Sequence, residues 1–123
     1  NQFMNQPICR DLRSGVTMAV KIYNKLVRDK IPEIIESDGK ICKTEILSDE
    51  EYLKMLDAKL DEELAEYHKD QNIEELADLI EVIYAAAKAR GYSVDELEKV
   101  RVKKAEERGG FGEKVFLREV EDE

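Results

Sequence analysis

Two apolar helical segments that carry acidic side chains at matching positions constrain the fold of this chain most strongly. Glu63 and Glu66 are three residues apart, as are Glu75 and Asp78, and at 3.6 residues per turn each pair lies on one helix face. The sequence HKDQN between the segments has no apolar residue, and Asn72 followed by Glu75 is typical of a helix start. We therefore predict an antiparallel helical hairpin that turns within HKDQN.

The predicted hairpin brings four carboxylates together. Residues equidistant from the turn lie opposite each other, so Glu63 pairs across the hairpin with Asp78, and Glu66 with Glu75. Unit charges about 4 Å apart repel by roughly 4 kcal/mol at an effective dielectric constant of 20, so a cation or protons must offset the repulsion. Carboxylate oxygens suit Mg²⁺, which is often shared with substrate phosphates. The four residues are therefore candidate magnesium ligands in a phosphate-binding site.

A purely structural interpretation of these acidic residues is also open. Glu75 could be only the third residue of a capping box, and Glu62, Glu63 and Glu66 could form a solvated helix face. Asp78 favours the metal site, because it lies among apolar residues in ELADLIEVI. Asp in a helix interior costs up to about 0.7 kcal/mol relative to Ala, so its presence there needs a reason.

Length and charge narrow the classes of function. The 123 residues give room for one domain, and 40% charged residues with a net charge of −9 argue against a nucleic-acid polymer as ligand. No apolar run approaches the roughly 20 residues of a membrane span, and no signal-peptide core precedes the domain. We expect a cytoplasmic protein without a membrane partner. The one histidine, His68, lies at the predicted turn, which argues against a Ser-His or Cys-His catalytic centre.

Two segments precede the hairpin. Apolar residues show no sustained helical or strand periodicity over residues 1–20. We interpret this segment as an N-terminal extension without an assigned role. A basic cluster that includes Lys25 and Arg28 then precedes Pro32, which fits the first turn of a short helix ending at Gly39. Cationic side chains before a helix start favour anions, so both are candidates for phosphate contact. Ordinary surface pairing with nearby glutamates is the alternative.

Three longer helices and two short strands complete the predicted fold. Each helix begins with a capping-box pattern, and the three cover residues 49–69, 73–90 and 94–108. Apolar and polar residues alternate in places over residues 41–47, which predicts a short strand with KVFL at 114–117 as its partner. The predicted fold class is mainly α, with residues 21–118 forming a helical bundle with a small peripheral β pairing, followed by an acidic tail over 119–123.

The second long helix predicts self-association. Residues 76–87 carry more apolar side chains than one hairpin partner and a third helix can cover, and large exposed apolar patches are uncommon on monomers. We expect a homodimer, or a tetramer of paired dimers, in which two hairpins form a four-helix bundle with the Ala85–Ala87 side inward. Basic residues of one subunit could then reach phosphates at the other subunit's site.

Four sequence blocks together resemble the all-α nucleoside triphosphate pyrophosphohydrolases of the MazG superfamily. The blocks are YNKLVRDKIPEII, EELAEY, EELADLIEVI and KKAEERGGF, and the match covers roughly residues 22–117. They are most similar to the branch described as phosphoribosyl-ATP pyrophosphohydrolase-like, or house-cleaning NTP pyrophosphatase. The superfamily motif EExxE followed by ExxD corresponds here to residues 62–66 and 75–78. The resemblance implies a MazG-like helical bundle.

The resemblance also implies a reaction and roles for individual residues. The family cleaves the bond between the α and β phosphates and releases a nucleoside monophosphate and pyrophosphate. The implied ligands of Mg²⁺, or of Mn²⁺ in its place, are Glu63, Glu66, Glu75 and Asp78. One of Glu62, Glu63 or Glu66 would orient or deprotonate the attacking water. The remaining phosphate contacts would come from Lys25, Arg28, Lys103 and Arg108. Phosphoribosyl-ATP is an alternative substrate, and a non-catalytic acidic helical dimer that binds a protein partner is an alternative of another class.

Overall fold

The computed structural model describes residues 19–122, and these residues form four helices without any strand. The helices are α1 (Ile31–Ser37), α2 (Asp49–Asp70), α3 (Ile73–Ala89) and α4 (Val94–Arg108). The mainly α prediction is confirmed, and the three long helices begin at the predicted residues. The predicted N-terminal extension lies almost entirely outside the described residues.

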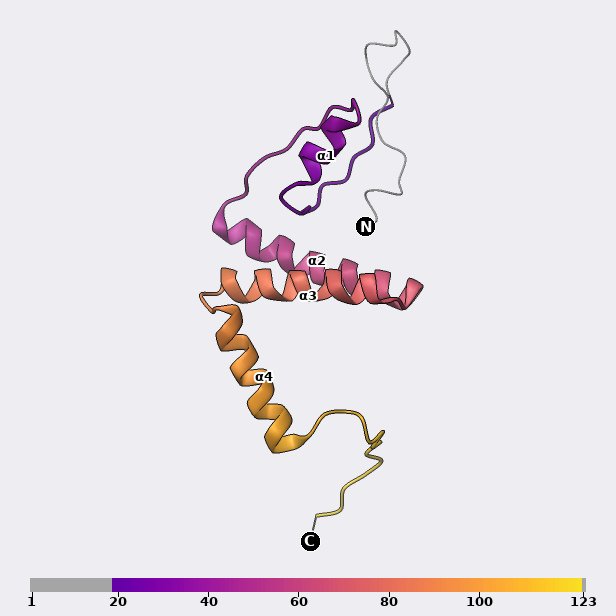
Figure 1. The fold of residues 1–123 in the computed structure, drawn as a ribbon, viewed down its shortest axis with the longest axis vertical. Helices are drawn as coiled ribbons and strands as arrows, with labels where there is room; N and C mark the ends of the chain where they lie inside the picture. Colours follow the sequence, from indigo (N-terminus) through magenta and orange to yellow (C-terminus); the bar gives the residue numbers. More distant parts are fainter. Residues whose placement is uncertain (1–18, 123) are drawn as a thin grey trace.

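Side-chain caps fix the beginnings of the three long helices. The side chains of Ser48, Asn72 and Ser93 accept hydrogen bonds from the backbone N–H three residues later, which satisfies donors that have no partner inside the helix. Gln71 adopts a left-handed conformation, with φ 50° and ψ 37°, and reverses the chain between α2 and α3. The predicted antiparallel hairpin is therefore confirmed, and its turn lies within HKDQN (Figure 1).

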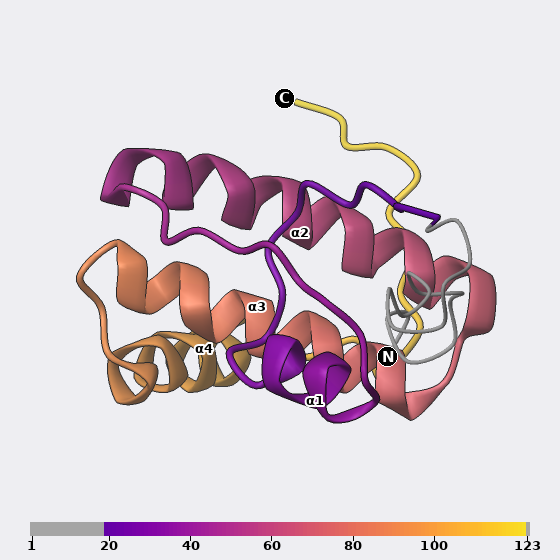
Figure 2. The same cartoon turned by 90° about the horizontal axis from the view of Figure 1, so that it is seen from above.

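The α2–α3 hairpin is the centre of the molecule. The α1 helix and the segments that flank it lie over one face of the hairpin, whereas α4 extends from the opposite side (Figures 1 and 2). Leu56 of α2 and Val82 of α3 are buried. A second small core forms where Ile31 and Ile35 of α1 pack against half-buried side chains that include Val27. This packing joins α1 to the segments on either side of it.

The predicted peripheral β pairing is wrong for the described residues. Residues 41–47 and 114–117 have no regular secondary structure. The first segment connects α1 to α2, whereas the second follows α4 on the other side of the hairpin (Figure 1). A strand needs a neighbour for its backbone N–H and C=O groups, and the path of the chain keeps these two segments apart.

The α3 helix is not buried on all sides within this chain. Four of its apolar side chains are exposed in this chain and follow a spacing of three and four residues: Ile73, Leu76, Ile80 and Ile83. We call these four residues the apolar seam. Ala85, predicted to face a second subunit, instead lines a cleft beside Asp78. The apolar side chains of α3 that lack cover within this chain therefore lie along the seam.

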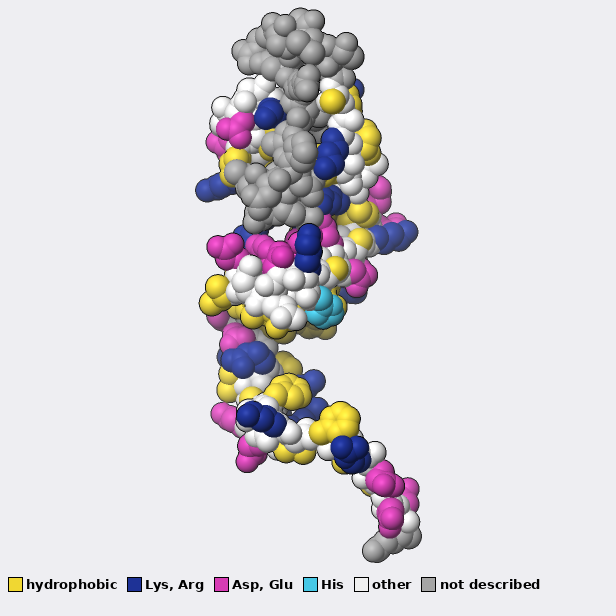
Figure 3. Space-filling view, turned by 90° about the vertical axis from the view of Figure 1, so that its right-hand side faces the viewer, with side chains coloured by type: hydrophobic (Ala, Val, Ile, Leu, Met, Phe, Trp, Pro, Cys, Tyr) yellow, Lys and Arg dark blue, Asp and Glu magenta, His cyan; other side chains and the backbone are white. Residues whose placement is uncertain are grey.

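Hydrophobic side chains remain exposed from the hairpin to the C-terminal segment, as Figure 3 shows on one face of the molecule. The α4 helix has no buried residue, and Phe111 and Phe116 beyond it are largely exposed. No helix in the described part of the chain combines the length and apolar character that a bilayer span requires.

Candidate functional site

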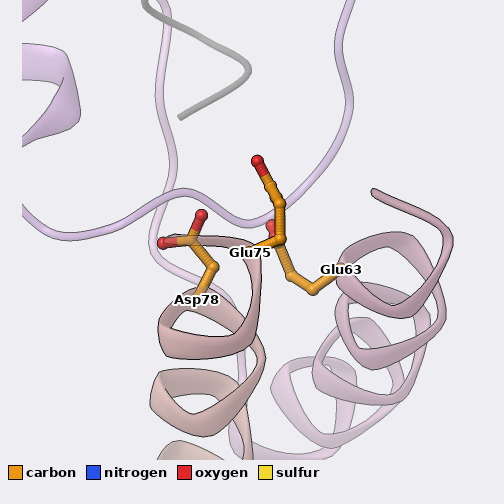
Figure 4. A group of neighbouring side chains, drawn as sticks. All are labelled: Glu63, Glu75 and Asp78. Atoms are coloured by element: carbon orange, nitrogen blue, oxygen red, sulfur yellow. The ribbon is translucent and has the colours of Figure 1, made fainter. Parts of the chain in front are cut away.

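Three carboxylates from the two hairpin helices meet on the face that α1 covers. Glu63 of α2 and Glu75 and Asp78 of α3 each offer an oxygen, and these oxygens lie within 4.8 Å of one another (Figure 4). Glu63 is 6% exposed and Glu75 is 8% exposed, although glutamate is almost never buried without a partner. Their location follows from the capping box and turn, which set the register of the two helices. We call these three residues the acidic triad.

Glu66 belongs to a neighbouring group rather than to the acidic triad. Its carboxylate lies within 4.8 Å of the carboxylates of Asp70 and Glu75, so Glu75 is shared between the two groups. Sequence reasoning predicted one volume for all four acids and did not include Asp70. Asp70 lies one turn after Glu66 in α2, so the four-residue spacing could have identified it, but HKDQN was interpreted as turn.

Four ion pairs connect the acidic face to cations. Lys25 contacts Glu62 at 2.6 Å, and Arg28 Nη2 contacts Asp78 Oδ1 at 2.6 Å. Lys59 contacts Glu62 at 3.0 Å and Glu63 at 3.3 Å. Lys59 was missed in the sequence, although it lies one helical turn before Glu63, a spacing that favours ion pairs.

Glu62 differs from its neighbours in charge environment. Burial alone would raise the pKa of Glu62, but hydrogen bonds and charge attraction from Lys25 and Lys59 outweigh burial and lower it. Its carboxylate therefore stays ionised, and it belongs to neither of the two carboxylate groups among the described residues. The structure places this predicted catalytic residue in an ion-pair network beside the acidic triad.

Glu75 has the opposite environment. Burial raises the pKa of Glu75, and the negative charges of Asp78, Glu66 and Glu63 raise it further. Its carboxylate forms no ion pair with the other described residues. A nearly buried carboxylate that faces three others and forms no ion pair within residues 19–122 fits a hard divalent ion, for which all-oxygen donor sets are typical. This donor set fits Mg²⁺ and Mn²⁺.

Lys103 and Arg108 do not lie at this site within one chain. Both belong to α4, which extends from the side of the hairpin opposite to α1 (Figure 1). Lys103 is exposed and forms its ion pair with Glu107 of the same helix, at 3.9 Å. The phosphate contacts of these two residues stay a prediction, and within one chain both residues lie away from the acidic triad.

A cleft of about 560 Å³ begins at the acidic triad and runs between α2, α3 and the segment before α1. Glu63 and Asp78 line it, and Leu56 and Val82 contribute apolar wall. The cationic side chains that line the cleft are those of Arg28, Lys59 and Lys88. Tyr52, Glu81 and Lys88 were not predicted as site residues, and no local pattern marks them, because the cleft exists only once the segment before α1 lies over the hairpin.

Glu75→Gln is expected to raise the melting temperature of the metal-free protein at neutral pH, because the neutral amide removes repulsion from three carboxylates. A raised pKa in the folded state means that ionised Glu75 destabilises the fold, so stability is lost as the pH rises through that pKa. The advantage of the variant should accordingly shrink towards acidic pH. Thermal melts in EDTA across this range measure the effect, and a variant no more stable than the wild type would contradict it.

Thermal melts of the same two proteins with Mg²⁺ in place of EDTA test metal binding. A ligand that binds only the folded protein stabilises it by about 2.7 kcal/mol at 100 times its dissociation constant. We expect this stabilisation in the wild type and its loss in Glu75→Gln, with exposed Glu50→Gln as the control that keeps it.

Comparison with known proteins gives little further guidance. No family model and no solved structure matches the chain. A protein of Mycolicibacterium smegmatis, described only as uncharacterized, is 57% identical over 42 residues. The match covers 34% of this chain and 43% of that protein, so the chain spans less than half the length of this relative. Because that protein has no described activity, function has to be argued from the site itself.

Proposed function

We propose that the chain is a Mg²⁺-dependent nucleoside triphosphate pyrophosphohydrolase that releases a nucleoside monophosphate and pyrophosphate. The observation that carries this proposal is the acidic triad at one end of a cleft with apolar walls and three cationic side chains. Carboxylates that can hold a metal suit a polyphosphate, and apolar walls suit a nucleobase. The sequence blocks that resemble the MazG superfamily support the same reaction and a MazG-like fold.

Each group of residues has a role in the proposed reaction. Glu63, Glu75 and Asp78 would hold Mg²⁺, or Mn²⁺ in its place, which would neutralise phosphate oxygens and lower the pKa of a bound water. Arg28 and Lys59 line the cleft beside the triad and would bind phosphate oxygens. Glu66, next to the shared Glu75, is our candidate for accepting the proton of the attacking water.

The size of the cleft limits the substrate. Its volume of about 560 Å³ lies within the range of roughly 300–1,000 Å³ that is common for small-molecule sites. One nucleotide is therefore the proposed substrate, and we favour a house-cleaning role on non-canonical triphosphates. Phosphoribosyl-ATP is the alternative substrate of the same reaction. A nucleic-acid polymer is not proposed, because the net charge is −9.

We further propose that the enzyme is a cytoplasmic homodimer, or a tetramer of such dimers. The apolar seam of one hairpin would pack against the seam of another, because identical stripes of apolar side chains are self-complementary about a two-fold axis. The second subunit would also bury exposed hydrophobic side chains of α4 and of the segment after it. In that assembly Lys103 and Arg108 would act only at the partner's site.

The apolar seam also favours a second function, that of a non-catalytic helical module that binds a protein partner. Four exposed apolar side chains at helical spacing are the pattern by which one helix docks on another. Under this alternative the acidic face has no metal ligand role, so thermal stability would be indifferent to Mg²⁺.

Pyrophosphate release tests the proposed reaction directly. The protein is incubated with canonical, deoxy and damaged nucleoside triphosphates and with phosphoribosyl-ATP, in Mg²⁺, Mn²⁺ or EDTA. We expect equimolar monophosphate and pyrophosphate from at least one of these substrates, and only with metal. Release of orthophosphate and a diphosphate would indicate cleavage at the other anhydride bond. No product from any substrate with either metal would overturn the proposal.

A further inference from the structure

The carboxylates of the acidic triad differ in how their charges are neutralised. Asp78 has the guanidinium of Arg28 at 2.6 Å, and Glu63 has the ammonium of Lys59 at 3.3 Å. Glu75 has no ion-pair partner among the described residues and is 8% exposed. With all groups ionised, the triad and its two cations have a net charge of −1. The chain itself therefore neutralises part of the negative charge of the acidic triad.

The two cations are held in different ways. Lys59 is 12% exposed, belongs to the same helix as Glu63 and also contacts Glu62 at 3.0 Å. Arg28 comes from the segment before α1, fifty positions from Asp78 in the sequence, and its side chain is 49% exposed. Its side chain bridges two elements and has solvent on one side. Arg28 is the cation that can leave the triad without disturbing a helix.

The surroundings of Arg28 permit such a movement. Its carbonyl oxygen accepts a hydrogen bond of 3.0 Å from the N–H of Ile31, and Ile31 is buried in the small core under α1, so the backbone is anchored. The side chain borders both the 560 Å³ cleft and a second hollow of about 480 Å³ that Asp78 also lines. Arg28 thus lines both hollows.

We propose that Arg28 is an exchangeable counterion, paired with Asp78 in the metal-free site and transferred to nucleotide phosphate once a divalent cation binds the triad. This inference rests on the proposed function. The cation and Arg28 compete for the same carboxylate, so an empty site holds Arg28 away from phosphate. Metal binding then adds positive charge and releases a guanidinium whose fork geometry suits phosphate oxygens. Metal and nucleotide thereby strengthen each other's binding reciprocally.

Direct metal binding tests the exchange without any turnover. Free Mn²⁺ is measured by electron paramagnetic resonance in titrations of wild type, Arg28→Gln and Lys30→Gln, first without nucleotide. Lys30→Gln is the matched control. Lys30 lies two positions after Arg28, carries the same charge and lines only the second hollow. We expect Arg28→Gln to bind Mn²⁺ about 5-fold more tightly than the wild type or more, and Lys30→Gln to stay within 2-fold of it, on the order of a general charge effect.

The same titrations with a non-hydrolysable triphosphate analogue give the second readout. The wild type should gain Mn²⁺ affinity about 5- to 150-fold with the analogue, the usual range of coupling between sites, and Arg28→Gln should gain clearly less. Equal Mn²⁺ affinity in Arg28→Gln and Lys30→Gln would overturn the exchange while leaving wild-type metal binding, and so the proposed function, intact. A wild type that binds no Mn²⁺ at all would overturn both. Melts in EDTA check that each variant is folded.

Discussion

Glu63→Gln is expected to reduce pyrophosphate release about 10³-fold or more while leaving the protein folded. Glu63 comes from α2, whereas the other two members of the acidic triad come from α3, so it supplies the only triad ligand on its side of the hairpin. A metal ion contributes several kcal/mol to such a reaction, and each 1.36 kcal/mol corresponds to a tenfold change in rate. The amide keeps the shape of the side chain and removes its charge.

The ion-pair network makes this substitution structurally mild. Lys59 loses its contact with Glu63 at 3.3 Å but keeps the one with Glu62 at 3.0 Å, so no buried cation is left unpaired. Asp61→Asn is the matched control, because Asp61 is an exposed carboxylate two positions earlier on the same helix. Steady-state rates with saturating Mg²⁺ and the best substrate measure the effect. Retention of full activity in Glu63→Gln would remove this residue from the site, and an equal loss in Asp61→Asn would point to a non-specific cause.

Ile80→Asp is expected to convert a dimer into a monomer and to lower the melting temperature markedly. Ile80 is 46% exposed in the isolated chain, and a surface substitution of that kind changes stability by only about 0.5 kcal/mol. If the apolar seam is an interface, the same substitution buries two carboxylates at a two-fold axis without partners, which costs far more. The size of the effect therefore distinguishes an interface from a free surface.

The control for this experiment is another apolar residue outside the seam. Ile46 is 99% exposed in the segment before α2, and Ile46→Asp should leave both mass and melting temperature unchanged. Sedimentation at micromolar concentration gives the mass of each protein. A wild type that sediments at the chain mass of 14.2 kDa would end the dimer proposal. If Ile46→Asp lowered the melting temperature as much as Ile80→Asp, the effect at Ile80 would not indicate an interface at the apolar seam.

The sequence predicted the hairpin because its determinants are local. The caps at Ser48 and Asn72 lie three residues from their targets, and the turn needs only a polar segment that one left-handed residue can reverse. A short turn between two capped helices fixes which residues lie opposite each other. The proximity of Glu63 and Asp78 could therefore be predicted from sequence spacing alone, before any long-range contact was known.

The details that distinguish the acidic residues could not be predicted in this way. Glu62 and Glu63 are adjacent in the sequence, yet Glu62 pairs with Lys25 from a segment 37 positions away and Glu63 joins the acidic triad. The pairing of Glu62 depends on where a connecting segment passes, and many paths of similar local energy are available to a loop.

The sequence by itself thus determined the mainly α class, the hairpin and the face on which its acidic residues gather, since propensity, capping and helical period act within one or two turns. Only the tertiary structure decided that residues 41–47 and 114–117 lie too far apart to pair. It also decided that the segment before α1 closes a cleft beside the acidic triad and that the apolar seam, rather than Ala85, is left exposed. These outcomes depend on contacts between residues distant in sequence, whose closure entropy and packing are properties of the whole chain and not of any local pattern.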